Sequence, residues 1–153
     1  MMASVSIKID VSKYTKNIDQ IIHNVKRAIE IGTNNVMEVM QEESSDIIYS
    51  YPESAWYVRT GNLGRNYDIV QMWGSETTYT AILMNRSNYF RYVELGTGIY
   101  APGGRQTPWC FQTADGNWHW TKGMEGRHSM SETFEKYKDK IKPYLVEEIK
   151  KVL

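Results

Sequence analysis

The sequence has almost no cysteine. Cys110 is the only one in 153 residues, so an internal disulfide is excluded and a cysteine-based zinc site lacks its other ligands. The three histidines, His23, His119 and His128, are scattered, and neither a His-x-x-x-His pair nor an Asp-rich loop is present. The sequence therefore predicts no metal site and no cofactor.

An excess of charge is also missing, because 18 lysine and arginine residues balance 18 aspartate and glutamate residues. Nucleic-acid binders gain much of their affinity by neutralising phosphates, so this balance argues against a dedicated one. No stretch approaches the roughly 18 consecutive apolar residues of a membrane-spanning helix. The segment 1–10 lacks the basic start and apolar run of a signal peptide. We therefore expect a soluble protein that is made without export and has no membrane partner.

A readable catalytic pattern is absent as well. The sharpest enzyme hypothesis takes Cys110 as a nucleophile and His119 or His128 as its base, but no residues at readable spacing supply an orienting group or oxyanion donors. The glycines in 96–98 and 103–104 lack the Gly-Lys-Ser/Thr ending of a phosphate loop. We expect that the protein is not an enzyme and has no small-molecule substrate.

The sequence does have the length and composition of one globular domain, 1–153, with 41% hydrophobic and 24% charged residues. Alternating apolar residues predict a strand over 5–11. Apolar residues spaced by three and four predict a long amphipathic helix over about 17–50, roughly 50 Å long if unbroken. Gly32 on its apolar stripe indicates either close packing or a bend. Three interpretations of this long pattern remain open. It is one helix whose overhang packs on neighbouring subunits, a broken helix, or an ordinary core helix.

Two hairpins are predicted after this helix. Residues 67–73 and 77–84 favour β structure around a Gly-Ser-Glu turn, which predicts an antiparallel pair. Residues 109–112 and 117–120 flank an Asp-Gly turn and predict a second, shorter pair. One or two helical turns are expected over 89–95, between the two hairpins.

The last predicted helix begins at Ser129, which has the capping-box spacing to Glu132. Its apolar stripe runs to Val152, and Pro143 is expected to kink or split the helix near Lys142. Together the elements predict an α+β fold. In it, an antiparallel sheet of about four strands packs against the long N-terminal helix and the C-terminal helix, with a protruding loop rich in glycine, proline and aromatic residues.

The stretch 89–127 has an unusual composition, with three of the five tryptophans, seven of the eleven glycines and two of the four prolines. Glycine permits positive φ, proline restricts the backbone and aromatic side chains anchor loop ends. The mixture predicts a rigid, irregular loop that the short hairpin closes. Trp109 and Phe111 share one face of their strand, as Trp118 and Trp120 do on the opposing strand, which predicts cross-strand aromatic pairs.

Charged residues in this stretch permit further interpretations. Glu94 is expected to accept hydrogen bonds from loop N–H groups or to pair with Arg105, and the alternative is a solvated surface charge. Four basic residues among the aromatics are compatible with a nucleic-acid surface. Three acidic residues leave a net charge of only +1, so an assembly loop is favoured over a DNA groove. The basic residues are Arg91, Arg105, Lys122 and Arg127.

Four blocks of the chain, 59–63, 92–98, 101–109 and 116–123, follow one another in the order of a known signature. They read Arg-Thr-Gly-Asn-Leu, Tyr-Val-Glu-Leu-Gly-Thr-Gly, Ala-Pro-Gly-Gly-Arg-x-Thr-Pro-Trp and Gly-Asn-Trp-x-Trp-Thr-Lys-Gly. In these blocks the chain resembles a phage head–tail joining family, the small neck or tail-completion proteins of lambda-like and Hong Kong-type long-tailed bacteriophages. The resemblance covers nearly the whole chain, because a long helix precedes the blocks and a shorter one follows them.

The resemblance implies site residues in three groups. The assembly loop consists of Tyr92, Glu94, Gly96, Thr97, Gly98, Pro102, Gly103, Gly104, Arg105, Pro108 and Trp109. The hairpin that supports it contributes Trp118, Trp120, Lys122 and Gly123. The upstream motif consists of Thr60, Gly61, Asn62 and Leu63, at a turn leading into the sheet.

The function that the resemblance implies is structural. The chain is expected to be a minor tail component of a tailed phage or prophage, a ring subunit that joins the DNA-filled head to the tail. Implied partners are other copies of itself, head-completion and tail-terminator proteins, and nonspecific contact with DNA in the channel. The implied location is the virion, assembled in the bacterial host cytoplasm. The alternative is a small monomeric nucleic-acid-binding module that uses the region 91–127.

A closed ring needs two different complementary patches on each subunit. We hypothesise that the loop over 92–109 is one patch and an exposed helix face is the other, because a loop so rich in aromatics needs a partner to bury it.

The chain departs from the family pattern in two places. Residues 126–129 stand where relatives commonly have Ala-Arg-Pro-Phe, and Gly64 stands where they usually have a basic residue. These departures put the contact at the start of the last helix in question.

Overall fold

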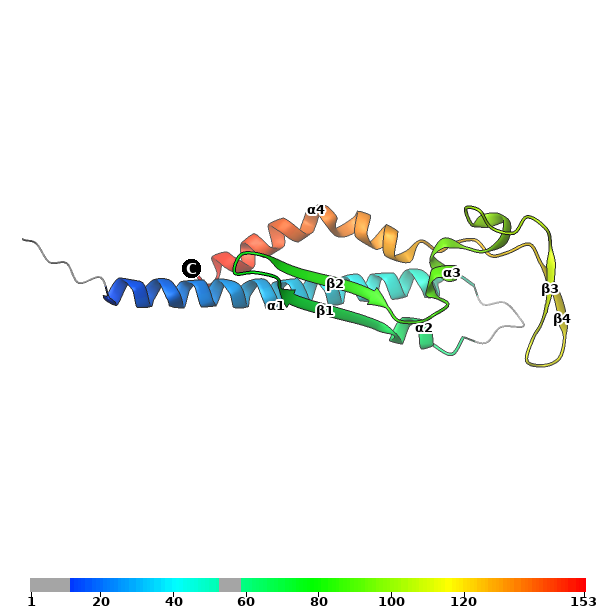
Figure 1. Ribbon diagram of the computed structural model, residues 1–153, viewed down its shortest axis with the longest axis horizontal. Helices are drawn as coiled ribbons and strands as arrows, with labels where there is room; N and C mark the ends of the chain where they lie inside the picture. Colours follow the sequence, from blue (N-terminus) through cyan, green and yellow to red (C-terminus); the bar gives the residue numbers. More distant parts are fainter. Residues whose placement is uncertain (1–11, 53–58) are drawn as a thin grey trace, which may run out of the picture.

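The computed structural model describes residues 12–52 and 59–153. The strand predicted over 5–11 lies outside these residues. The described chain is elongated and has the α+β character that the sequence predicts (Figure 1). In chain order the elements are α1 (Ser12–Ser50), α2 (Asn62–Arg65), β1 (Tyr67–Trp73), β2 (Tyr79–Asn85), α3 (Phe90–Leu95), the 3-10 helix η1 (Gly98–Tyr100), β3 (Trp109–Gln112), β4 (Trp118–Thr121) and α4 (Ser129–Lys150).

Helix α1 is unbroken over 39 residues, which corresponds to a length of about 58 Å. Gly32 lies in its middle without interrupting it. A Cβ at Gly32 would lie 3.0 Å from Leu145 Cδ2, so close packing against α4 explains this glycine. The alternative of a broken helix is therefore wrong. In Figure 1 the N-terminal end of α1 extends past the end of α4 and past the tip of the β1–β2 hairpin.

Helix α4 runs antiparallel to α1, since Lys136 pairs with Glu43 near one end and Leu145 packs on Gly32 near the other. It continues through Pro143, so the predicted split near Lys142 is wrong. Pro143 lies on the exposed side of the helix, so the carbonyl that proline leaves without a donor is on the side open to solvent and is not buried against α1. The helix curves over α1 instead of ending (Figure 1).

Small and polar side chains fill much of the interface between these helices. Ser44, Ser129 and Thr133 are fully buried there, which lets the two backbones approach closely. Buried apolar side chains are few among the described residues and comprise Ala28, Met40, Ile48 and Leu63, of which only Ile48 is fully buried. The chain on its own therefore leaves much of its apolar surface in contact with water.

The β1–β2 hairpin is antiparallel, as predicted, with Tyr67 opposite Asn85 and Trp73 opposite Tyr79. One face of it lies on α1. Trp73 Nε1 donates to Glu30 Oε1 at 2.6 Å near the tip, and the Tyr67 hydroxyl lies 2.5 Å from Ser44 Oγ near the base. Burial raises the pKa of Tyr67, and the negative charge of Glu94 adds to this.

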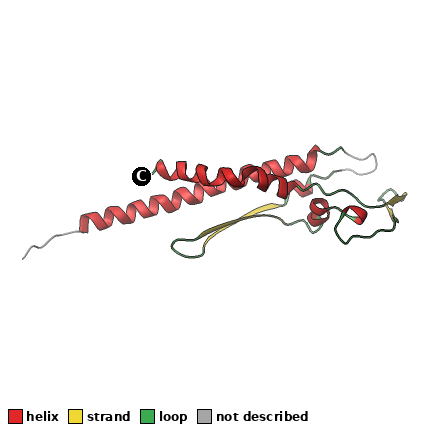
Figure 2. Cartoon of the chain, turned by 90° about the horizontal axis from the view of Figure 1, so that it is seen from above, coloured by secondary structure: helices red, strands yellow, loops and turns green. Residues whose placement is uncertain are grey.

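The predicted single sheet of about four strands is wrong. The structure has two separate antiparallel two-stranded sheets, β1–β2 and β3–β4. The first lies along α1, and the second lies beyond the C-terminal end of α1 (Figures 1 and 2). The reason is that segments 93–99 and 122–128, which lead to and from β3–β4, pair with each other and direct this hairpin away from β1–β2.

Candidate assembly site

Segments 93–99 and 122–128 lie side by side and antiparallel, and we call this pair the glycine joint. It connects α3, the loop over 101–108, β3–β4 and α4. Its backbone hydrogen bonds run from Arg127 N to Val93 O at 2.8 Å, His128 N to Glu94 O at 3.1 Å, Thr97 N to Met124 O at 2.8 Å and Ile99 N to Lys122 O at 3.0 Å.

Glycine is required in this joint because the two backbones nearly touch. A Cβ at Gly98 or Gly123 would lie well inside 3.0 Å of a carbonyl oxygen on the other segment, and one at Gly126 would lie 2.6 Å from Glu94 O. Gly98 and Gly123 also have φ of +60° and +123°, which L side chains rarely adopt. Gly96 and Gly98 of the block 92–98 and Gly123 of the block 116–123 are thus explained by a close backbone contact.

Glu94 is buried and caps the N-terminus of α4. Its carboxylate accepts hydrogen bonds from Ser129 Oγ at 2.9 Å, from Met130 N at 3.1 Å, and from Ser131 N and Oγ at 3.1 Å each. The free N–H groups and the positive end of the helix dipole favour a carboxylate here. The predicted hydrogen bonds from the following loop to Glu94 and its predicted pairing with Arg105 are both wrong. The alternative prediction, that Glu94 is a solvated surface charge, is wrong as well.

The predicted capping box at Ser129 is wrong for the same reason. Ser129 is already inside α4, and the preceding His128 has a left-handed φ of 48° and no side-chain cap. The Ser129 hydroxyl donates to Glu94, so Glu94, which lies 35 positions away, caps the helix N-terminus in place of Glu132.

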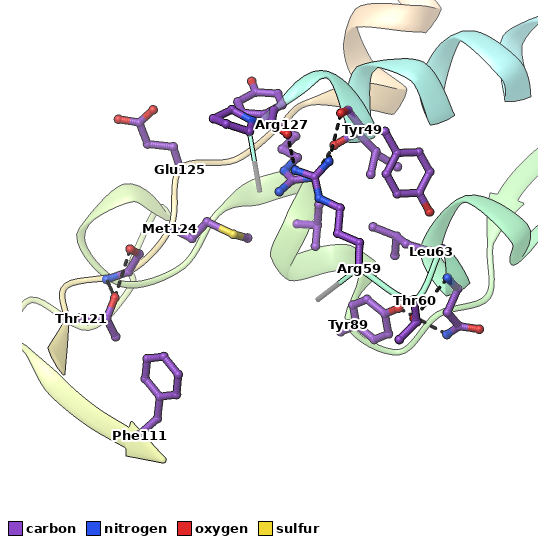
Figure 3. A pocket seen from close by; sticks show the side chains of 17 residues that line it. Tyr49, Arg59, Thr60, Leu63, Tyr89, Phe111, Thr121, Met124, Glu125 and Arg127 are labelled. Atoms are coloured by element: carbon purple, nitrogen blue, oxygen red, sulfur yellow. Dashed lines mark hydrogen bonds between the residues drawn. The ribbon is translucent and has the colours of Figure 1, made fainter. Parts of the chain in front are cut away.

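Two arginines bind the C-terminal end of α1 (Figure 3). Arg127 Nη1 donates to Ile48 O, and its guanidinium lies 5.0 Å from the centre of the Tyr51 ring. Arg59 donates to Tyr49 O at 3.0 Å and to Tyr51 O. Cations suit the unpaired carbonyls at a helix C-terminus. The sequence did not predict this role, and Arg127 was considered only as one of four basic residues of a nucleic-acid surface that was not favoured.

The upstream motif lines a cavity of about 660 Å³ between the end of α1, α2 and the joint (Figure 3). Gly61 has φ 72° and starts the helical turn α2, so the predicted turn before the sheet is present. Leu63 is buried, Asn62 Nδ2 donates to the Tyr89 hydroxyl at 3.3 Å, and Arg65 Nη2 donates to Thr60 O at 2.6 Å.

Gly64, one of the two departures from the family pattern, lies against Tyr49 of α1. Its N–H donates to the Tyr49 hydroxyl at 2.8 Å, and a Cβ there would lie 2.6 Å from Tyr49 Cε2. Tyr49 therefore takes the space that a larger, basic residue would need.

The loop over 101–108 protrudes from the joint. Pro102 and Gly103 are exposed at its tip, and Gly104 N closes a turn on Ala101 O at 2.9 Å. Arg105 Nε donates to Thr107 Oγ1 at 3.0 Å, and the Arg105 guanidinium lies 5.7 Å from the centre of the Trp109 ring.

The register of β3–β4 places Cys110 opposite Trp120, Phe111 opposite His119 and Gln112 opposite Trp118. Because side chains alternate along a strand, Trp118 and Trp120 lie on the other face from Phe111. The predicted cross-strand aromatic pairs are therefore wrong, and Phe111 packs on His119 with ring centres 5.8 Å apart. Cys110 and His119 also lie on opposite faces, so they do not form the hypothesised nucleophile and base.

Trp118 and Trp120 are 66% and 74% exposed. Further exposed apolar side chains lie on α3 and around the joint, at the same end of the molecule. We call the whole set the aromatic end, and it comprises Tyr92, Leu95, Ile99, Tyr100, Trp118, Trp120 and Met124. The predicted assembly residues thus divide in two groups. Glu94, Gly96, Thr97, Gly98 and Gly123 build the joint, whereas Tyr92, Pro102, Gly103, Arg105, Pro108, Trp118 and Trp120 lie on the surface. Lys122 belongs to both groups, because its carbonyl accepts from Ile99 N and the residue is exposed.

Within 12–52 and 59–153, no three histidine, cysteine, aspartate or glutamate side chains gather as ligands for a metal ion. None of the described helices combines the length and the apolar character of a membrane span. Comparisons of the chain with protein-family models, with curated proteins and with solved structures find no match.

Proposed function

We propose that this chain is a structural subunit of the neck of a tailed phage or prophage particle, where a ring of copies joins the DNA-filled head to the tail. The observation that carries the proposal is the distribution of exposed apolar side chains. One set lies at the aromatic end and another on the N-terminal part of α1, at opposite ends of an elongated chain, and others lie between them on α1, the β1–β2 hairpin and α4.

Contiguous exposed apolar surface on a folded protein marks contacts with other proteins. A ring of copies needs two different patches on each subunit, and a joining ring needs a further surface for the head or the tail. This chain exposes apolar side chains at several separate places, including both of its ends. The four sequence blocks that resemble the joining family supply the second support. Gly96, Gly98, Gly123 and Glu94 from two of these blocks form one structural unit, and the hairpin that leaves this unit carries the exposed Trp118 and Trp120.

The proposed partners are further copies of the chain, the head-completion and tail-terminator proteins, and DNA that passes through the channel without being bound specifically. Assembly takes place in the bacterial host cytoplasm, and no catalytic step is part of the role. The alternative of a nucleic-acid-binding module loses support, because Arg127 binds the end of α1 and Arg105 lies on Trp109.

The test combines light scattering with an assembly assay. We expect the purified chain to form ring-sized particles as its concentration rises, and to restore the joining of heads and tails in an extract that lacks it. The double variant Trp118→Ala/Trp120→Ala is expected to lose joining. Phe134→Ala, which removes a similarly exposed aromatic side chain from α4, is the matched control and should retain it.

Two results would contradict the proposal. One is a chain that stays monomeric at every concentration and is absent from joined particles. The other is tight binding of DNA at physiological salt by the monomer, which would favour the nucleic-acid module.

A further inference from the structure

The N-terminal part of α1 carries an apolar stripe that α4 does not cover. Gly32 packs on Leu145, five residues before the end of α4 at Lys150. Because the helices are antiparallel, α4 ends beside α1 little more than one turn before Gly32. The stripe nevertheless continues toward the N-terminus, and we call residues 16–25 the overhang (Figure 1). Its exposed apolar residues are Ile18, Ile21 and Ile22, which are 54%, 44% and 48% exposed.

The outer side of β1–β2 is a second uncovered apolar surface. Since Tyr67 and Trp73 face α1, alternation turns the even-numbered residues of both strands away from α1. We call the apolar ones the hairpin face, which consists of Val70, Met72, Ile82 and Met84. Met72 is 51% and Ile82 is 43% exposed. In Figure 2 no described element lies over the outer side of this hairpin.

A two-stranded sheet with apolar side chains on both faces is suited to a place between two layers. One layer is the α1 of its own chain. A helix with an apolar stripe is the usual second layer, and the overhang is such a helix without a partner.

The two surfaces also differ in charge. The overhang contains one basic and one acidic side chain, and two basic residues, Lys26 and Arg27, follow it directly. Residues 66–85 contain two acidic side chains, of which Asp68 pairs with Arg86. The basic residues at the end of the overhang and Glu76 at the tip of the hairpin favour contact of an overhang with a hairpin face over contact between two hairpin faces.

We infer that the overhang of one copy of this chain packs on the hairpin face of a second copy. The inference rests on the self-assembly in the proposed function and deepens it, because it names the surfaces through which copies meet. The contact is heterologous, so each copy offers one overhang and one hairpin face and the arrangement repeats. The aromatic end takes no part in it and stays available to a different protein.

Site-directed cross-linking tests the contact. In a Cys110→Ser background, one full-length variant carries Ile21→Cys and another carries Ile82→Cys, at the centres of the two surfaces. After mixing and mild oxidation, we expect the mixed disulfide dimer in at least tenfold excess over the dimer from a matched control pair. The control pairs Ile82→Cys with Phe134→Cys, because Phe134 is exposed to a similar degree but lies on α4.

The products separate the outcomes. A main product of Ile21→Cys joined to itself would mean that overhangs pair with each other, and would overturn the inference. A mixed dimer no more abundant than the control would overturn it too, and would leave the overhang as a contact for another protein.

A chain carrying both cysteines separates the contact from the ring. Covalent closed particles in light scattering would support both the inference and the proposed function. Covalent open fibres would support the contact and contradict the ring, while closed particles without cross-links would support the ring and contradict the contact.

Discussion

The two ends of this molecule are held in different ways. At the glycine joint, backbone contacts, a buried carboxylate and Arg127 fix several segments at once. At the overhang, a single helix extends without a neighbour among the described residues, and its isoleucines face water. We therefore expect the joint to decide whether the chain folds. The overhang is free to make contacts with other chains. Four substitutions test this division, from the largest expected effect on stability to the smallest.

Gly98→Ala is expected to have the largest effect. Its Cβ would collide with the carbonyl of Lys122, and alanine is strained at a φ of +60°. We expect a loss of about 4 kcal/mol or more in the free energy of unfolding, or a failure to fold. Gly103→Ala is the matched control, because Gly103 also has positive φ (+72°) but has nothing within 4 Å of the added Cβ. There we expect a loss of only about 1 kcal/mol. Urea denaturation compares the two, and equal losses would show that the close approach in the joint is unimportant.

Glu94→Gln is expected to destabilise the chain by about 2 to 3 kcal/mol. The amide keeps the shape of the side chain but loses the charge that faces the first turn of α4, and its NH₂ group is turned toward N–H donors. Glu125→Gln removes an exposed carboxylate from the same joint and should change stability by less than about 0.5 kcal/mol. Denaturant titrations of both variants make the measurement. If the two variants lose the same amount, Glu94 is not the cap of α4.

Tyr67→Phe is expected to lower the free energy of unfolding by about 1 kcal/mol, because it leaves the buried Ser44 hydroxyl without its partner.

The same variant tests a pH dependence. Burial raises the pKa of Tyr67 above its ordinary value of 10.0, so the unfolded chain loses this proton first. The stabilisation is complete below pH 10 and is lost as pH rises through the higher pKa of the folded state. Denaturation series on either side of pH 10 should show a smaller decline in Tyr67→Phe than in the parent. An equal decline would mean that Tyr67 ionises alike in both states.

Ile21→Ser is expected to change stability by less than about 0.5 kcal/mol, because the side chain is already exposed and α4 does not cover it. Assembly measured by light scattering should nevertheless weaken, since the substitution removes apolar surface from the overhang. A large fall in the thermal midpoint of the monomer would show that the overhang is part of the folded core, and would break the comparison.

Local patterns in the sequence predict the local elements. The three-four spacing predicts α1 and α4, and alternation with turn residues predicts both hairpins. Each of these signals lies within a few neighbouring residues, so the sequence contains it directly. Helix propensity alone did not predict that α4 continues through Pro143. The helix continues because that residue lies on its exposed side.

The arrangement of these elements depends on contacts between distant residues. Glu94 reaches α4 across 35 positions and Arg127 reaches α1 across 79, and nothing in the neighbourhood of either residue indicates its partner. The two-sheet arrangement has the same origin, since the joint pairs segments that a local pattern treats as separate loops. Trp118 and Trp120 were recognised as important, but the strand register that exposes them follows from the length of the turn.

The glycine joint also determines how the molecule carries a mechanical load. Its two segments are antiparallel, and their hydrogen bonds cross between them at several points along their length. A pull that slides one segment past the other along that length loads these bonds together in shear, instead of opening them one after another. Arg127 passes the load to the end of α1 and Glu94 passes it to the start of α4, so force applied at the loop and β3–β4 is divided between two long helices. A load on the protruding loop is therefore shared by α1 and α4 through two separate contacts.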